Sequence, residues 1–319
     1  MKQLVDTKQL SHEEWLNWRR KGIGGSDAAA IAGLNPYKSP VEVWADKTSE
    51  KQEEKPDTES MRIGRDLEEY VASRFTEATG KKVRRKNAII QSDEYPFMIA
   101  NVDRMVVGEN ALLECKTTSP YNDDKWIGGR CPINYEIQCH HYMAVTGADK
   151  VYLACLILGR RFTIVEIPRD DELIQNLVNI EQDFWNKYVT TKQMPPPDGS
   201  DSADEIIEKM YPEGSPDIDL VLDYMQAALD RYDEISNMID QLETEKNQIK
   251  QQIKMEMGEA ESSYIGERKI TWKAPKQSYT IDSKKLKDEK PEIYDQYKKE
   301  KKATRTFRIS AKKKGEIDE

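Results

Sequence analysis

The apolar side chains of residues 62–188 alternate between the spacing of helices and the spacing of strands. Leu67, Val71 and Phe75 recur every four residues, and Gly80 is well placed to end that helix. The sequence predicts helices over 62–78, 133–145 and 170–188, and strands over 83–90, 97–105, 111–117, 151–158 and 161–168. This order predicts an α/β fold in which a mixed sheet is flanked by helices.

Two segments without periodicity interrupt this pattern. Residues 48–59 are charged and contain a proline, which is typical of an exposed loop. Residues 194–202 read MPPPDGSDS, where three prolines and an Asp-Gly pair favour a domain boundary. In a chain of 319 residues we therefore expect one domain over 1–200 and a C-terminal module over 201–319.

Beyond the proline-rich segment 194–202, apolar residues recur in steps of three and four. The positions are Ile218, Val221, Met225, Ala228, Tyr232, Ile235, Ile239, Leu242, Lys246, Ile249 and Ile253. The pattern predicts one long helix, either a coiled-coil seam or a helix lying in a groove, that ends at Gly258. Short strands are expected over 261–265 and 268–273, followed by a basic, mostly helical arm over 283–314.

Charge is unevenly distributed along the chain. The formal net charge is −9, yet residues 283–314 contain thirteen Lys or Arg against five Asp or Glu. Binding to a phosphate backbone depends on local cations, so the basic arm can bind nucleic acid despite the acidic body. A solvated tail is the alternative, and charge alone leaves both open.

Several protein classes are disfavoured by composition. No apolar run approaches the roughly 18–20 residues that a membrane span needs, and the N-terminus has no signal-peptide pattern, so we expect a cytoplasmic protein. The four cysteines form no CxxC pair, which argues against a disulfide framework. Cys131, Cys139, His140 and His141 fit no common zinc spacing, because neighbouring histidines on a helix point about 100° apart.

Charged residues interrupt the end of an otherwise apolar strand, ALLECK. Glu114 and Lys116 are two residues apart and share one face of that strand, while Cys115 points away. A turn at Gly108 would bring Asp103 of the preceding strand toward Glu114. Two carboxylates beside a lysine suit a hard cation such as Mg²⁺, although a salt-bridged strand face is the simpler alternative.

A second set of candidate residues lies near the N-terminus. The segment WRRKGIGGSDAAAIAG combines consecutive cations with glycines and a small-residue helix that Ser26 or Asp27 can cap. The N-terminus of such a helix favours an anion. An ordinary helix cap with surface cations explains the same residues equally well.

The motifs RRKGIGGSDAAAIAGLNPYKSPVEVW, GRDLEEY, NVDRM, ECKTT and YEIQCHHYMAVTG occur in this order. Together they resemble the YqaJ-type viral recombinase family over roughly residues 11–190. Members of that family are phage and prophage alkaline exonucleases related to lambda exonuclease, within the PD-(D/E)xK nuclease superfamily. The resemblance implies a nuclease core in the N-terminal domain.

The resemblance also implies roles for individual residues. Asp103, Glu114 and Lys116 match the nuclease motif, with Val102 where the motif has proline. Glu68, with Glu69 as the fallback, matches a helix glutamate that supports the metal ions, and the carbonyl of Cys115 would complete the coordination shell. The implied cofactor is Mg²⁺, as two ions that Mn²⁺ can replace.

Two further sets of residues follow from the same match. Gln138 and Tyr142 correspond to the catalytic Gln-x-x-x-Tyr motif, whose spacing puts both on one face of a helix. Arg20 with Ser26 corresponds to the site that holds the 5′-terminal phosphate, with Arg19 as the next residue to consider.

By this resemblance we expect a metal-dependent 5′-to-3′ exonuclease that resects double-stranded DNA ends for annealing recombination in a phage or prophage. Its expected partners are DNA ends, a RecT-like single-strand annealing protein and further copies of the chain in a ring, trimer or tetramer. The alternatives are a non-catalytic DNA-binding recombination scaffold and a sequence-specific endonuclease of the same superfamily.

Overall fold

The computed structural model describes residues 1–49, 57–215, 218, 220–299 and 305–310. The chain divides into two compact units, Met1–Pro212 and Glu213–Glu319. The division falls later than the expected boundary at residue 200, because helix α7 (Asp201–Met210) packs on helix α3 (Pro40–Thr48) within the first unit. The backbone N–H of Ser39 donates to Ser202 Oγ at 3.2 Å, and Ala203 is buried.

The first unit is built on a five-stranded mixed sheet in the order β2-β5-β6-β7-β8. Its strands are β2 (Val83–Arg85), β5 (Arg104–Val106), β6 (Ala111–Thr118), β7 (Lys150–Ile157) and β8 (Arg161–Pro168). Strands β6 and β7 are parallel and the other neighbours are antiparallel. The predicted fold class, an α/β fold with a mixed sheet flanked by helices, is confirmed.

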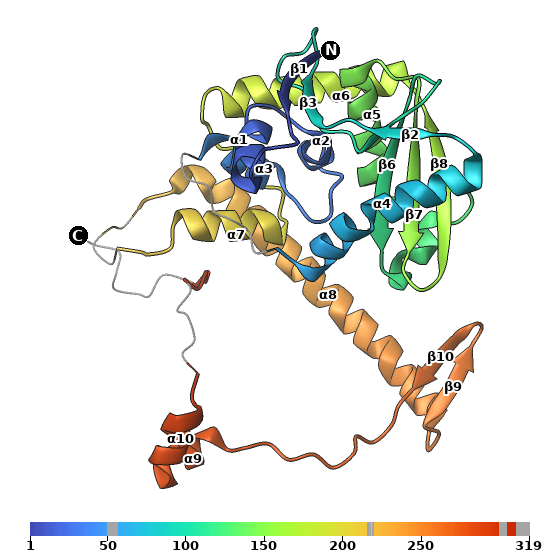
Figure 1. Cartoon of the computed structure of the whole chain (residues 1–319). Coiled ribbons are helices and arrows are strands. Elements are labelled where there is room, and N and C mark those ends of the chain that lie inside the picture. Colours follow the sequence, from blue (N-terminus) through green and yellow to red (C-terminus); the bar gives the residue numbers. More distant parts are fainter. Residues whose placement is uncertain (50–56, 216–217, 219, 300–304, 311–319) are drawn as a thin grey trace. The chain divides into compact units, whose positions relative to one another are not determined.

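Helices cover both faces of this sheet (Figure 1). Helix α4 (Glu59–Thr79) packs Val71 and Phe75 against one face, and its N-cap is Thr58 and its C-cap Gly80, at φ +71°. Helices α5 (Ile133–Thr146) and α6 (Asp171–Phe184) cover the other face. Because side chains alternate along a strand, β6 contributes apolar residues to both of these cores.

Two of the predicted strands are each divided between two sheets. The expected strand 83–90 becomes β2 and β3 (Ala88–Gln91), and the expected strand 97–105 becomes β4 (Ile99–Ala100) and β5. Strands β3 and β4 join β1 (Lys2–Asp6) in a separate sheet of order β1-β3-β4. The chain leaves one sheet and enters the other between Ala100 and Arg104, so Asp103 lies just before β5 rather than within a strand.

The N-terminal segment adds three short helices to this framework. They are α1 (His12–Arg19), α2 (Gly25–Ile31) and α3. The expected small-residue helix is therefore present as α2, and it packs on α5. A Cβ atom on Gly25 would lie 2.7 Å from Tyr142 Cε1, which explains why glycine stands where these two helices meet.

A buried ion pair holds α5 against α6. His141 Nδ1 lies 2.8 Å from Glu181 Oε1, His141 Nε2 lies 2.9 Å from the carbonyl oxygen of Ile99, and neither charged side chain is exposed. Burial alone would lower the pKa of His141, but the Glu181 carboxylate and the Ile99 carbonyl oxygen raise it. Both ring nitrogens face acceptors, so the doubly protonated imidazolium satisfies this site.

We expect this pair to make the native fold less stable as pH rises. A raised histidine pKa gives stability that is complete below the unfolded pKa of about 6.5 and is lost as pH rises through the higher folded value. Urea unfolding at pH 6 and pH 8 measures the effect, with His12→Gln as the exposed control. His141→Gln should unfold more easily by about 3 kcal/mol and lose much of the pH dependence. A His141→Gln protein that kept the wild-type pH dependence would contradict this.

The second unit consists of a long helix, a hairpin and two short helices. They are α8 (Gln226–Met257), β9 (Ser262–Ile265), β10 (Arg268–Thr271), α9 (Ser283–Glu289) and α10 (Pro291–Tyr297). Helix α8 ends at Gly258 as predicted, but it begins at Gln226 rather than at 218. The consecutive apolar residues Leu220, Val221 and Leu222 lack the helical period and precede a 3₁₀ turn at Asp223–Met225.

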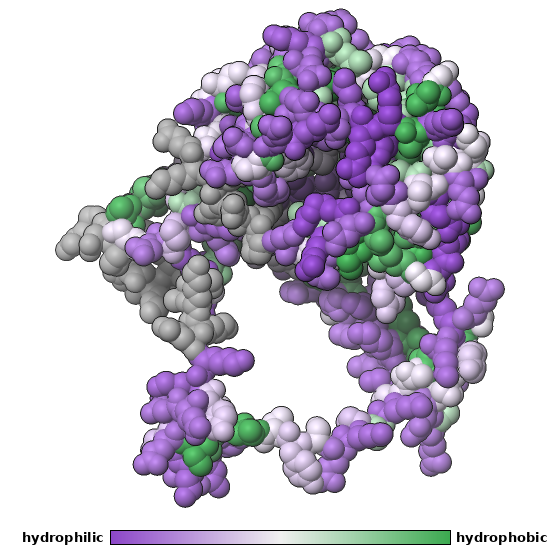
Figure 2. Space-filling model, in the orientation of Figure 1, coloured by the Kyte–Doolittle hydropathy of each residue, from purple (hydrophilic) through white to green (hydrophobic). Residues whose placement is uncertain are grey.

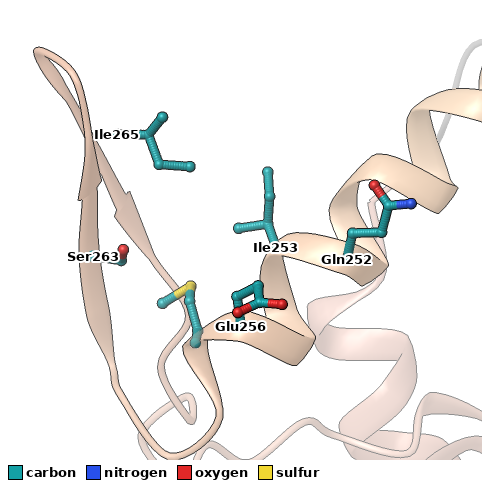
Figure 3. A pocket seen from close by; sticks show the side chains of 6 residues that line it. Gln252, Ile253, Glu256, Ser263 and Ile265 are labelled. Atoms are coloured by element: carbon teal, nitrogen blue, oxygen red, sulfur yellow. The ribbon is translucent and has the colours of Figure 1, made fainter.

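The hairpin folds back beside the last turns of α8. Ile253, Met257 and Ile265 line a pocket of about 250 Å³ between them (Figure 3). Figure 2 shows hydrophobic residues among hydrophilic ones along this unit. No helix in the described part of the chain has an apolar stretch long enough to cross a bilayer. Residues 300–304 and 311–314 of the expected basic arm lie outside the described residues.

Candidate active site

The turn at Gly108, with φ +84°, joins β5 to β6 and brings the two predicted carboxylates together. Asp103 Oδ2 accepts a hydrogen bond of 2.8 Å from the backbone N–H of Cys115, which places its carboxylate beside Glu114 on β6. The Cys115 side chain points to the opposite face and packs in the core beneath α4. The sequence-based expectation that Asp103 approaches Glu114 is met.

Lys116 and Gln138 close a hydrogen-bond network around Glu114. Lys116 Nζ donates to Glu114 Oε1 at 2.7 Å and to Gln138 Oε1 at 3.1 Å. Gln138 Nε2 donates to Glu114 Oε1 at 2.7 Å and to Tyr142 Oη at 2.8 Å. The hydroxyl of Tyr142 donates in turn to the carbonyl of Asn101 at 3.3 Å. Helix α5 therefore places Gln138 and Tyr142 on the carboxylate site, as the resemblance implied.

The site carries negative charge that its own residues do not fully balance. Burial raises the pKa of Asp103 well above its ordinary value, and the nearby carboxylates of Glu114 and Glu68 raise it further. Glu114 Oε2 is buried and has no hydrogen-bond partner among the described residues. For Lys116, burial alone would lower the pKa, but the two carboxylates raise it and keep the ammonium charged. An unpartnered carboxylate oxygen at a buried site is a position that a cation can fill.

The helix glutamate that faces this site is Glu68 rather than Glu69. Glu68 Oε1 accepts a 2.6 Å bond from Arg104 Nη1, and its charge acts on Asp103. Glu69 is more exposed and pairs with Arg85 and Arg104. Of the two glutamates, only Glu68 is among the charges that act on Asp103, and a role for Glu68 in metal binding stays a prediction.

The residues of this site suit Mg²⁺, which keeps part of its water shell, better than an ion whose ligands are all protein side chains. No group of three His, Cys, Asp or Glu side chains is close enough to hold an ion within the described ranges. Mg²⁺ commonly binds through one or two carboxylates and keeps several water molecules. Asp103 and Glu114 provide such a pair, with Glu68 near enough to act on Asp103.

The N-terminal site forms around Arg19, and the expectation for Arg20 is wrong in its geometry. Arg19 Nη2 donates to Ser26 Oγ at 2.9 Å. Arg20 instead donates to the main-chain oxygens of Asp46 and Ser49 at the end of α3. Adjacent helical residues point about 100° apart, so only one of the two arginines can face α2.

Three residues of this site were not expected from the sequence in these roles. The buried Asp27 pairs with Lys38 Nζ at 2.7 Å and with Lys47 Nζ at 2.8 Å. Burial alone would raise the pKa of Asp27, but the two lysines lower it well below its ordinary value. Asp27 also accepts from the backbone N–H of Gly24 at 3.1 Å, so it fixes the first turn of α2. The signal was weak because the lysines lie 11 and 20 residues from Asp27, and no local spacing relates either of them to it.

Fold and site together define an α/β protein in which the central strand of the sheet, β6, joins two carboxylates, a lysine and a helix-borne glutamine. A separate cluster of cations lies around Asp27. The YqaJ-like viral recombinase domain matches residues 14–149. The chain is also 44% identical over 301 residues to the uncharacterized protein YqaJ of Bacillus subtilis (strain 168), covering 93% of this chain and 94% of the relative. This chain therefore belongs to the YqaJ-like viral recombinase family.

Solved structures to which this chain is similar include two described as exonucleases. The alkaline exonuclease LHK-Exo from Laribacter hongkongensis is 20% identical, with a TM-score of 0.49 over 57% of this chain and 94% of that one. A phage related exonuclease from Haemophilus somnus 129PT is 15% identical, with a TM-score of 0.40 over 56% of this chain and 99% of that one.

Proposed function

We propose that this protein is a metal-dependent 5′-to-3′ exonuclease that resects double-stranded DNA ends for annealing recombination. The observation that carries the proposal is the Asp103–Glu114 pair with its unpartnered carboxylate oxygen, next to Lys116, in a member of a viral recombinase family. A salt-bridged strand face is the simpler alternative, but it would not explain why a second carboxylate, Asp103, lies beside Glu114, where burial and like charges raise the pKa of Asp103.

In this proposal Asp103 and Glu114 hold Mg²⁺, with Glu68 in support and the carbonyl of Cys115 as a further ligand. The ion supplies Lewis acidity for hydrolysis of a phosphodiester. Lys116 is fixed by Glu114 and Gln138, so its ammonium is positioned to orient an attacking water and to stabilise negative charge. Gln138 and Tyr142 keep these groups in place through the network that ends at Asn101.

The cluster around Arg19 favours an exonuclease over a sequence-specific endonuclease. Arg19, Lys38 and Lys47 all act on the buried Asp27 at the start of α2. Asp46 also pairs with Lys47, at 3.4 Å, so three cations face two carboxylates and one positive charge is left over. A terminal phosphate is the group on a DNA end that such a cluster would select. An enzyme that cuts within a duplex has no need to recognise that group.

Arg19→Ala is expected to reduce the preference for 5′-phosphorylated over 5′-hydroxyl ends by about tenfold, because a charge-assisted hydrogen bond to the phosphate is lost. Arg20→Ala is the matched control, because Arg20 contacts the end of α3 instead. Cleavage rates on the two kinds of end, measured side by side, give the preference. Loss of the preference in the Arg20 variant alone would reverse this assignment.

The biological setting is proposed from the family. A resected end exposes a single strand, on which a RecT-like annealing protein would load, in the cytoplasm of a host that carries the phage or prophage. We also propose that several copies of the chain assemble, as a ring, a trimer or a tetramer. The second unit, which continues beyond the family match, would provide contacts to DNA, to the partner or to other copies.

One assay tests the function directly. Linear duplexes with and without a 5′ phosphate, each strand carrying a different label, are incubated with the protein in Mg²⁺, in Mn²⁺ and in EDTA. Shortening of the phosphorylated 5′ strand in either metal, and none in EDTA, is expected. Binding without cleavage would favour a recombination scaffold, and internal cuts at fixed positions would favour an endonuclease.

A further inference from the structure

A shallow cleft opens where strand β6 ends, in the first unit. One side is Tyr37, in the loop between α2 and α3. The second side is Thr118 on β6 with Asn122 and Lys125 on the 3₁₀ helix Pro120–Trp126. The third side is Asn134 and Tyr135 on α5. Its volume of about 40 Å³ corresponds to about three water molecules. That volume suits a phosphate group better than a nucleobase.

The cleft continues the line of the candidate active site. Glu114, Lys116 and Thr118 are alternate residues of β6 and share one face, so Thr118 lies about 7 Å beyond Lys116 along the strand. Tyr135 joins the two regions, because its ring centre lies 4.8 Å from Lys116 Nζ. A DNA strand that leaves the carboxylates along β6 therefore meets this cleft first.

The lining has the chemistry of a nucleotide site. The Tyr37 side chain is 72% exposed and offers a free ring face, and Lys125 is exposed with no ion-pair partner among the residues described. Asn122 Nδ2 is held toward the cleft by Thr118 Oγ1 at 3.1 Å. Two acids lie between Asn122 and Lys125, and neither lines the cleft. Asp123 is bound by Arg161 Nε at 2.7 Å, which offsets its charge, and Asp124 is exposed to solvent, which screens its charge.

We infer that this cleft holds the phosphate next to the scissile one, with the adjoining base stacked on Tyr37. Lys125 and Asn134 contact the phosphate oxygens, and the ring of Tyr37 takes whichever base is present, because stacking tolerates every sequence. This assignment rests on the proposed function and adds to it a site that positions the strand. It would add one cation, Lys125, to the path of the DNA strand beside the acidic centre.

Binding of full-length protein to a 5′-phosphorylated duplex, measured by fluorescence anisotropy in Ca²⁺, tests the cleft. Tyr37→Ala should weaken binding about tenfold through lost stacking. Lys125→Ala should weaken binding and lower the slope of log affinity against log salt by about one. The matched controls are Tyr121→Ala and Lys82→Ala, which remove exposed side chains outside the lining. Circular dichroism verifies that all four variants fold.

Substrates with one abasic position in the 5′ strand separate stacking from a structural effect. Removal of the base that stacks on Tyr37 should weaken DNA binding by the wild-type protein about tenfold. The same abasic substrate should bind Tyr37→Ala as tightly as the intact duplex does. The proposed role of the cleft is refuted if Tyr37→Ala and Lys125→Ala bind DNA as tightly as their controls. It is also refuted if no abasic position weakens wild-type binding. Either result holds even if the wild-type protein cleaves DNA in Mg²⁺. If wild type binds with this pattern but never cleaves, the proposed nuclease fails and the binding cleft stands.

Discussion

Asp103→Asn and Glu114→Gln are each expected to lower the rate of DNA cleavage by at least about a thousandfold. Both replacements keep the shape of the side chain and remove the charge that a divalent ion needs, so the ion and the stabilisation it gives to the phosphate are lost together. Glu114 is buried and Asp103 is half-buried beside it, so solvent cannot replace the charge that either variant removes. We expect EDTA to reduce wild-type cleavage to the same level.

Two neighbouring pairs of variants sharpen this test. Glu68→Gln should raise the Mg²⁺ concentration needed for half-maximal cleavage. The control Glu69→Gln should not, because Glu69 pairs with Arg85 and Arg104 and is not among the charges that act on Asp103. Lys116→Met should lose cleavage but keep Mg²⁺ binding in calorimetry, because its removal leaves the carboxylates in place. Wild-type cleavage by either isosteric variant, or loss of Mg²⁺ binding only in Lys116→Met, would refute the assigned roles.

The carboxylate site was predictable because its geometry is local. Alternation along β6 puts Glu114 and Lys116 on one face, and the short turn at Gly108 limits where Asp103 can lie. The four-residue spacing of Gln138 and Tyr142 likewise fixes both on one face of α5. In each case a few consecutive residues determine the relation between the side chains.

The N-terminal cluster was less predictable because its partners are distant in sequence. Whether Arg19 or Arg20 faces Ser26 depends on where α1 ends, and Arg20 is the C-cap of that helix. Lys38 and Lys47 meet Asp27 only because α3 packs beside α2. The divided strands have a similar cause, since the separate sheet forms only when β1 pairs with β3 across more than eighty residues.

The boundary between the units also depended on tertiary contacts. The prolines of residues 194–202 suggested a cut after residue 200, but Ser202 binds Glu42 and Ser39, and Ala203 is buried. Truncation within this segment would therefore expose the surface of α3 that α7 covers. A test of the second unit is better made after Pro212, or by point variants on α8 that leave the chain intact.

The apolar seam of α8 is expected to hold copies of the chain together. Its residues alternate in steps of three and four, and all except the half-buried Ile253 are exposed within the described part of the second unit, Leu242 to 63%. A long helix with one unburied apolar stripe must cover it with another surface. A second copy would suit the pattern, because Glu245 and Lys250 occupy the g and e positions that pair between parallel helices.

Ile235→Glu combined with Leu242→Glu should dissociate the assembly. In a two-stranded seam the double variant buries four like charges, and their burial without partners is costly. The matched control is Asn237→Glu with Thr244→Glu, which adds the same charges at the same spacing on the outer face of α8. Sedimentation equilibrium over a range of protein concentrations should give a monomer for the first pair and the wild-type mass for the second. Lys246 occupies an a position of the seam, so Lys246→Ile should strengthen association. A wild-type protein that is already monomeric, or a seam variant that keeps the wild-type mass, would show that α8 does not join copies of the chain.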